Sequence, residues 1–490
     1  MVSHIPALDV FVVTNNLTKR KYLRMRQFHF STILISTLLF VCPSVAQTSI
    51  DINRKLTPEQ LIEDVVFYVK TIEETHINPY AHISQKEWRA RADSIKSRIA
   101  AQGAMTQHEF WLLFTPLVSA LQDKHTLVMD PRFFIANNPT KYLPVRTIYV
   151  DGKIVVTSSV ADVKITKGAV IASINGIESD EVVRRLSKYR FGVGRERISD
   201  VGEWLWIGAA EVLGRPDSFA LSFSGGTKAD VKGLTVAEII NREKAISVNQ
   251  PKTSDLPLEL KLLDNNVAYL KASTFDLDLE EYKALLRDVF TRIKSAGVRG
   301  LIVDVRDNEG GASKLGDALI DMFSAKPQKR FLMKWKKSTQ YAERMKSENA
   351  PIPDYYQALT PGQVYTSNPE IVKPGENPLR FNGQVYVLSG RKTFSSGLMF
   401  LGVVKDNKLA TVIGEETNQP GCSAGESYPF NLPNSRLRVM SSTKYWIPPG
   451  GCNGSRGVVP DVSVKQGLED YRAGRDAILS AALDLFKRKP

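Results

Sequence analysis

Cysteine and histidine, the residues that most often bind metals or build disulfide frameworks, are scarce in this sequence. Only three of its 490 residues are cysteine and only six are histidine. A single histidine, His125, lies beyond the first predicted helices. Because a zinc site normally needs three or four clustered ligands, this composition leaves little material for one. We therefore predict a protein without a metal centre.

Long hydrophobic runs are absent after residue 46, so we expect no stable membrane span. Before that point, basic residues at 19–26 precede an apolar run at 30–41 and small residues at 44–46. This pattern is typical of a secretory signal peptide that is cleaved near Ala46. We therefore predict an exported protein, periplasmic or extracellular.

Two further features of the leader bear on this prediction. Met25 followed by Arg26 would begin a signal peptide of ordinary length, so an upstream start codon is one explanation for residues 1–24. Lipid attachment at Cys42 is not expected, because Phe40 lies shortly before this cysteine and Pro43 directly follows it.

Acidic residues do not balance the basic ones, since 52 Asp and Glu stand against 65 Lys and Arg, a net charge of +13. The excess is scattered, with one local cluster at residues 329–337. A scattered excess is typical of a solvated surface, and an exported protein seldom meets nucleic acid. We therefore expect no nucleic-acid partner.

After the leader, the cysteines are Cys422 and Cys452, each in a glycine-rich loop. In an oxidising compartment two thiols tend to pair, so we predict a disulfide between them. The alternative is two unpaired, buried thiols.

The first two regions after the leader differ in their predicted secondary structure. Residues 47–140 predict a small helical domain of three helices, each opened by a capping box. The boxes are Thr57 with Gln60, Ser84 with Glu87, and Thr106 with Glu109. Residues 141–240 predict a compact β-rich module of short strands with Gly and Asn turns. Its segment 167–177 resembles the strand and turn of PDZ domains, with a helix expected at 180–186.

Residues 255–490 alternate strands and helices. Apolar strands are predicted at 267–271, 300–305 and 385–388, which indicates an α/β domain with a largely parallel, covered sheet. Residues 326–380 are rich in lysine and proline and show little periodicity. We expect this segment to be an inserted flap or a disordered excursion.

A serine stands between the predicted strand 385–388 and an apolar helix. At this turn the hydroxyl of Ser395 projects at the sheet edge, and the positive dipole end of the following helix faces any negative charge that develops. The amide of Ser396 then lies beside that charge. A serine before a helix is more often only an N-cap, so the pattern leaves both interpretations open.

Paired glycines and a histidine complete the candidate set. Gly310 and Gly311 follow strand 300–305 at its carboxyl end, where α/β proteins place their sites and where glycine amides can approach a ligand. A plain loop is the alternative. His125 follows a helix end that leads into the β module, a junction from which a side chain can reach another domain. A surface or satisfied core histidine is the commoner case.

Four segments, in this order, resemble the C-terminal processing (tail-specific) peptidases, and among them the branch of tricorn protease and the interphotoreceptor retinoid-binding protein repeats. They are residues 304–311, 385–395, 414–417 and 457–461. The resemblance implies a crotonase-like α/β catalytic domain, preceded by a helical region and a PDZ-like module. It also implies a serine peptidase that acts on peptides or protein tails without a cofactor.

The same resemblance assigns roles to individual residues. Ser395 is the expected nucleophile, and the amides of Gly310 and Ser396 are the expected oxyanion hole. In the processing-peptidase branch a lysine base follows the third segment, but residues 418–421 contain no lysine. Residues 123–126 resemble the element that carries the histidine of tricorn-like enzymes, so His125 is the predicted base.

One departure from the family pattern concerns the residue that orients this histidine. Tricorn-like enzymes use a glutamate just before segment 457–461, where this chain has none. Asn453 and Glu426 are the candidates in its place. The sequence therefore predicts an exported serine peptidase, with a catalytically weak or inactive binder of peptides or apolar ligands as the alternative on the same fold. An esterase is a third hypothesis.

Overall fold

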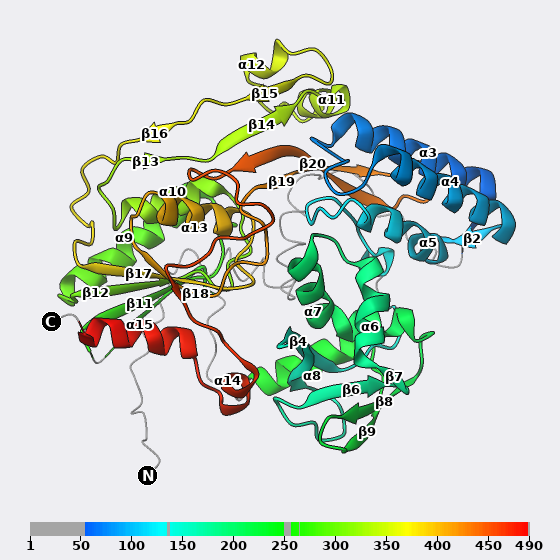
Figure 1. The fold of residues 1–490 in the computed structure, drawn as a ribbon, viewed down its shortest axis with the longest axis horizontal. Coiled ribbons are helices and arrows are strands. Elements are labelled where there is room, and N and C mark those ends of the chain that lie inside the picture. Colours follow the sequence, from blue (N-terminus) through cyan, green and yellow to red (C-terminus); the bar gives the residue numbers. More distant parts are fainter. Residues whose placement is uncertain (1–53, 135–137, 249–255, 264, 489–490) are drawn as a thin grey trace.

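The structure, a computed structural model, describes residues 54–134, 138–248, 256–263 and 265–488. The predicted signal peptide, its cleavage point near Ala46 and Cys42 lie outside these residues. Figure 1 shows a central sheet with helices on both sides, a group of amino-terminal helices and a separate β module. In this described part of the chain, no helix has the length and apolar character needed to cross a membrane.

The central sheet has six strands in the order β10, β11, β12, β17, β18, β21. β10 runs antiparallel to β11, and every other neighbouring pair is parallel. The strands are β10 (Leu258–Leu263), β11 (Val267–Ala272), β12 (Gly300–Asp304), β17 (Gln384–Ser389), β18 (Thr411–Gly414) and β21 (Val462–Ser463). The mixed α/β class and the largely parallel sheet are therefore as predicted.

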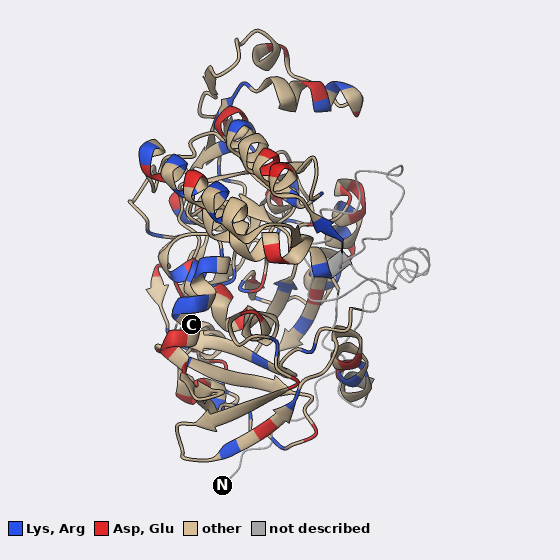
Figure 2. Ribbon diagram, turned by 90° about the vertical axis from the view of Figure 1, so that its right-hand side faces the viewer, with Lys and Arg blue, Asp and Glu red and all other residues tan. Residues whose placement is uncertain are grey.

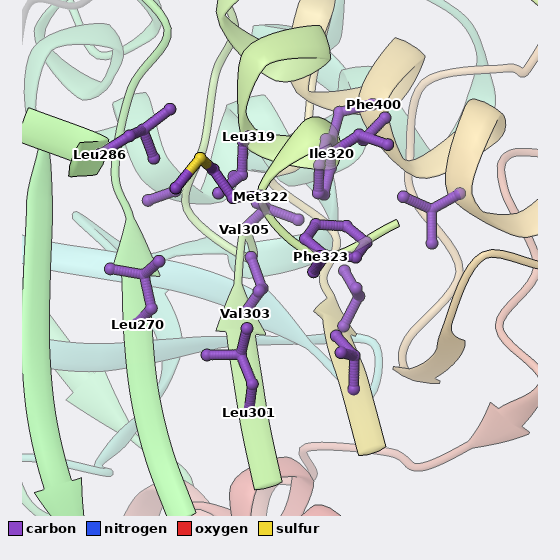
Figure 3. Packing of buried hydrophobic residues seen from close by; sticks show 14 of the residues in the cluster. Leu270, Leu286, Leu301, Val303, Val305, Leu319, Ile320, Met322, Phe323 and Phe400 are labelled. Atoms are coloured by element: carbon purple, nitrogen blue, oxygen red, sulfur yellow. The ribbon is translucent and has the colours of Figure 1, made fainter. Parts of the chain in front are cut away.

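Helices cover both faces of this sheet (Figure 1). On one face, Leu301 and Val303 of β12 pack with Phe400 in one buried cluster (Figure 3). On the other face, Ile302 packs with Phe486. Because both faces are buried, β12 is apolar at nearly every position, as parallel strands usually are. The covering helices are α9 (Leu279–Ser295), α10 (Ser313–Asp321) and α13 (Ser396–Asp406) on the first face and α15 (Ala477–Arg488) on the second.

A second, antiparallel sheet, which was not predicted, lies beside the first. Its strand order is β15, β14, β20, β19, and β3 pairs with β20. The strands are β3 (Leu127–Val128), β14 (Leu332–Lys336), β15 (Val364–Thr366), β19 (Ser423–Asn431) and β20 (Arg438–Ile447). This sheet connects chain segments that lie more than 300 positions apart, because β3 belongs to the amino-terminal region.

Residues 326–380, expected to be an inserted flap or a disordered excursion, form regular structure, so the disordered alternative is wrong. The segment contains β14 and β15 as well as β13 (Gln328–Lys329), α11 (Thr339–Ser347), α12 (Asp354–Gln357) and β16 (Ile371–Val372). Aromatic packing explains the order: Trp335, Tyr341, Tyr356 and Tyr428 share a buried cluster. The elements are too short for their apolar residues to show a period in the sequence.

Three helices form the amino-terminal region, as predicted: α3 (Pro58–Thr75), α4 (Gln85–Gln102) and α5 (Gln107–Ser119). The capping boxes at Thr57 and Thr106 are complete, whereas Ser84 only accepts from the Glu87 amide. A small ladder of β1 (Lys55–Leu56) with β2 (Met105–Thr106) joins the first and third helices. Their core also contains Leu432 and Val439, so these helices pack against the second sheet.

Residues 142–248 form the β module. Its strands are β4 (Val145–Val150), β5 (Lys153–Ser159), β6 (Val170–Ile174), β7 (Ile177–Glu178), β8 (Ser218–Phe223) and β9 (Lys228–Lys232). Its helices are α6 (Ser179–Leu186), α7 (Gly194–Val212) and α8 (Val236–Val248). Helix α7 was not predicted. Its Gly202 allows a close approach to β4, since a Cβ there would lie 2.3 Å from the Tyr149 amide nitrogen.

Charge is distributed over the fold in mixed sign. In Figure 2, basic and acidic residues are interspersed along the same helices and strands. Ion pairs tie the β module to the rest of the protein, among them Arg195 with Glu416 at 2.6 Å and Lys392 with Glu203 at 3.2 Å. Helix α14 (Leu468–Ala473) also contacts the module through Leu468.

Cys422 and Cys452 form a disulfide, which confirms the predicted pairing. The two residues are 30 positions apart, and the bridge joins the start of β19 to the loop after β20. It therefore closes the loop that contains the β19–β20 hairpin.

Replacing both cysteines by serine should lower the free energy of unfolding by about 3 to 4 kcal/mol, because the bridge restricts the unfolded chain over a loop of this length. Urea denaturation of the oxidised protein and of the double variant measures the difference. Adding a reductant should shift the wild-type midpoint and leave that of the variant unchanged. Equal midpoints for the two oxidised proteins would contradict the prediction.

Candidate active site

Ser395 lies at the turn between β17 and α13, at the carboxyl edge of the central sheet. Its backbone has φ 52° and ψ −122°, a conformation that non-glycine residues rarely adopt. The Ser395 side chain makes no capping hydrogen bond to α13, so it does not serve as an N-cap. A sharp, strained strand-to-helix turn of this kind exposes a hydroxyl at the sheet edge.

His125 reaches this hydroxyl across 270 sequence positions, with its Nε2 at 3.3 Å from the Ser395 Oγ. Its ring stacks on Phe394, with centroids 4.7 Å apart and planes 18° apart. The backbone of His125 is fixed at both ends, because its amide donates to Asp123 at 3.0 Å and its carbonyl accepts from the Ser427 hydroxyl at 3.0 Å. The structure thus brings together the two side chains that the sequence analysis selected.

The two expected oxyanion donors differ in their present partners. The amide of Gly310 donates to the Asn308 side chain at 2.9 Å. The amide of Ser396 has no hydrogen-bond partner among residues 54–134, 138–248, 256–263 and 265–488, and it stands in the first turn of α13. The Ser396 hydroxyl is occupied, since it donates to the Gly311 carbonyl at 2.5 Å.

Gly310 must be glycine for a steric reason. A Cβ at this position would lie 2.8 Å from the Ser395 Cβ and 2.9 Å from the Ser396 amide nitrogen. Its φ of 106° is also unfavourable for other residues. The paired-glycine loop therefore packs directly on the strained serine turn.

These residues line a cleft of about 640 Å³. Both apolar and charged side chains line it. The apolar lining near Ser395 consists of Phe331, Leu398, Met399 and Trp446. Such a mixture suits an extended peptide with at least one apolar side chain. In the described part of the chain, no group of three or more His, Cys, Asp or Glu has the arrangement of a metal site.

Residues 266–464 match the family model described as peptidase family S41. The region around the candidate site is therefore similar to peptidase family S41. This assignment confirms the predicted family and the predicted enzyme class, a serine-type peptidase.

The chain is also similar to a known protein and to solved structures. The chain is 22% identical over 222 residues to the tail-specific protease of Haemophilus influenzae, a match that covers 44% of this chain and 27% of that protein. The structure of mature CPAF complexed with lactacystin superimposes with a TM-score of 0.62 at 15% identity, covering 88% of this chain and 98% of that one. The photosystem II D1 C-terminal processing protease gives a TM-score of 0.42 at 16% identity, covering 86% of this chain and 99% of that one.

The electrostatic environment of the S41 site keeps the histidine neutral. Burial lowers the pKa of His125 below its ordinary value, Asp123 opposes this effect, and Lys124 adds to it. A hydrogen bond with the backbone of Ala424 favours the protonated ring. The imidazole is therefore uncharged near neutral pH and able to accept a proton.

Neither predicted orienting residue bonds to this ring. Asn453 is exposed in the loop after β20 and does not line the cleft. Glu426 lines the cleft but pairs with Lys444 at 3.1 Å. In the part of the chain that the structure describes, the group that meets the ring instead is the backbone of Ala424. The loss of the family glutamate is thus accompanied by a main-chain partner, which leaves no signature in a sequence.

Asp123 and His76 form hydrogen bonds that help to position His125, and neither was predicted as a site residue. Asp123 accepts from the His125 amide, from Thr126 at 2.6 Å and from His76 Nε2 at 3.0 Å. The amide of Asn78 donates to His76 Nδ1 at 3.0 Å, which fixes the proton of His76 on Nε2. Burial raises the pKa of Asp123, but the hydrogen bond with His76 outweighs this effect and holds the pKa well below its ordinary value.

Helix α7 of the β module contributes charge to the same region. Lys124 pairs with Asp200 at 2.8 Å and stands over the Phe394 ring at 4.8 Å. Nearby, burial raises the pKa of the Glu196 carboxyl to about 7, although Lys124 opposes the rise. Glu196 Oε1 has no hydrogen-bond partner in the described structure. The S41 site thus borders a buried carboxyl that titrates near neutral pH.

The raised pKa of Glu196 predicts a pH-dependent cost in stability. Between pH 4.5, its ordinary pKa, and pH 7 the folded protein retains a proton that the unfolded chain releases, so stability falls as pH rises through this window. The wild type should lose about 2 to 3 kcal/mol of unfolding free energy between pH 5 and pH 8 through this carboxyl, and Glu196→Gln should not show this loss. Urea denaturation of both proteins at the two pH values measures it.

The exposed Glu376 offers a matched control, since Glu376→Gln should change the stability difference between pH 5 and pH 8 very little. A Glu196→Gln variant with the same pH dependence as the wild type would show that this carboxyl is ionised in both states.

Proposed function

We propose that this protein is an exported serine peptidase that cleaves peptides or protein tails. The observation that carries the proposal is the contact of His125 Nε2 with the Ser395 hydroxyl at 3.3 Å, on a strained turn at the edge of an S41 sheet. A contact of this length is loose for a hydrogen bond, as is common in enzymes without bound substrate. The family match and the apolar cleft beside Ser395 support the same function.

In the proposed reaction, neutral His125 takes the proton of Ser395 while the Oγ attacks the peptide carbonyl. The amide of Ser396 donates to the developing oxyanion, and the dipole of α13 adds to this stabilisation. The protonated imidazole then gives its proton to the leaving amine, and water repeats the sequence on the acyl-enzyme. In this scheme the Gly310 amide joins the oxyanion hole by exchanging its bond to Asn308 for one to the oxyanion.

The non-catalytic alternative, a binder on the same fold, does not account for the environment of His125. A binding protein has no use for a partly buried imidazole that faces a strained serine, because both features cost stability. The name of the Haemophilus influenzae relative, a tail-specific protease, favours protein tails as substrates. The chain spans about a quarter of that relative's length, so substrate choice rests on the cleft rather than on this match.

A fluorophosphonate probe tests the nucleophile and the base together. The wild type should label, Ser395→Ala should abolish labelling, and His125→Ala should slow it by at least about 100-fold, because general-base help is lost. Labelled protein is quantified by mass spectrometry. The exposed Ser480 and His82 provide matched controls, and Ser480→Ala and His82→Ala should label as the wild type does.

Persistent labelling of Ser395→Ala would move the nucleophile elsewhere. Digestion of a peptide library separates a peptidase from an esterase, since only a peptidase gives cleaved peptides.

The pKa of His125 predicts the acid side of the pH profile. The base must be neutral to act, so kcat/KM should fall as pH drops through the His125 pKa. Because burial lowers that pKa, the midpoint should lie below about 6.5, the ordinary value for histidine. Lys124→Met removes a positive charge that lowers the pKa, so its midpoint should lie at higher pH than that of the wild type. A wild-type midpoint above 6.5 would contradict the proposed base.

A further inference from the structure

The backbone amide of Ser395 has its partner outside both elements that the turn connects. It donates to the side-chain oxygen of Gln419 at 2.5 Å. The positive φ of Ser395 stores strain, so neighbouring groups must hold this turn in place. The only side chain that bonds to the Ser395 amide in the described structure is that of Gln419.

Gln419 is itself fixed at several points. Its Nε2 donates to the Ser423 hydroxyl at 2.9 Å, and its carbonyl accepts from the Thr417 hydroxyl at 3.0 Å. The residue is 4% exposed. The carboxamide has one possible orientation here, since an amide N–H requires the oxygen and the nitrogen must donate. The side chain therefore presents an oriented acceptor to Ser395.

The loop that carries Gln419 is braced against the chain after β20. Cys422, three residues on, is bonded to Cys452. The Gly421 amide donates to the Arg456 carbonyl at 2.9 Å. Gly457 packs so tightly that a Cβ there would lie 2.1 Å from the Thr417 carbonyl oxygen. The acceptor thus stands on a rigid support rather than on a free loop.

We propose that Gln419 is a positioning residue for the nucleophile: its carboxamide oxygen holds the Ser395 amide and thereby keeps the Ser395 hydroxyl aimed at His125. The inference rests on the proposed function of Ser395. Gln419 acts through the backbone of Ser395 and takes no part in proton transfer. A neutral acceptor suits this place, because a carboxylate beside the oxyanion would oppose the charge that forms there.

Two substitutions separate the parts of this role. Gln419→Met keeps the size of the side chain and removes the acceptor, so the Ser395 hydroxyl is no longer held in the direction of His125. A small misplacement of reacting groups slows a reaction by up to about 100-fold, so kcat should fall by about 10- to 100-fold while KM stays within about two-fold. Gln419→Glu keeps the acceptor but adds charge when ionised, so the ratio of its kcat to that of the wild type should rise as pH is lowered.

The experiment measures peptide hydrolysis per active site, with active sites counted by fluorophosphonate titration of the full-length protein. A positioning role lowers the rate per titrated site, whereas a purely structural role lowers the number of sites and leaves the rate per site unchanged. Asn418, the neighbour on the same loop, lines a different cavity, so Asn418→Ala is the matched control and should keep the wild-type rate.

An unchanged rate per site in Gln419→Met, with the wild type fully labelled, would overturn this inference alone. A wild type that does not label at Ser395 would overturn the proposed function and this inference with it. If Gln419→Met yields too little folded protein, Ser423→Ala replaces it: loss of the Nε2 partner should lower the rate per site by a smaller factor, and an unchanged rate overturns the proposal.

Discussion

The pairing of β3 with β20 is the contact on which the arrangement of the site depends. β3 is only two residues long, Leu127–Val128, and it lies two positions after His125. This ladder helps to hold the histidine of the amino-terminal region at the edge of the central sheet. The Thr126 hydroxyl accepts from the Ser442 amide at 3.0 Å and adds a second link to the same strand. A long-range strand pairing thus determines a distance between two side chains.

Local signals made Ser395 and His125 candidates, and the resemblance to the processing peptidases assigned their roles. A strand, a turn and an apolar helix mark Ser395, and the helix end before the module marks His125. The central sheet was also predictable, because strands buried on both faces are apolar throughout. The disulfide followed from the compartment that the leader implies.

The missed features share a physical origin, since each depends on a partner far away in the chain. Gly202 resembles a turn residue until the Tyr149 backbone is seen beside it. His76 resembles a loop histidine until it donates to Asp123, 47 positions later. The fold of residues 326–380 depends on pairing with β20, which no periodicity within the segment reveals. The PDZ-like and crotonase-like assignments stay predictions from resemblance.

Charged groups are concentrated around the histidine. Lys124 and Asp200 are partly buried beside His125, and the buried Glu196 is left incompletely bonded. Of these groups Lys124 acts on the charge of His125, because it helps to lower the pKa of that imidazole.

The shared core of the amino-terminal helices and the second sheet has a consequence for synthesis. Leu432 and Val439 complete the core of helices that the ribosome makes more than 300 residues earlier. The strand that pairs with β3, β20, is made after both Ser395 and His125. A growing chain that ends before β20 therefore has its serine and its histidine but no means to join them. Such a precursor would lack the proposed catalytic pair until translation is nearly complete.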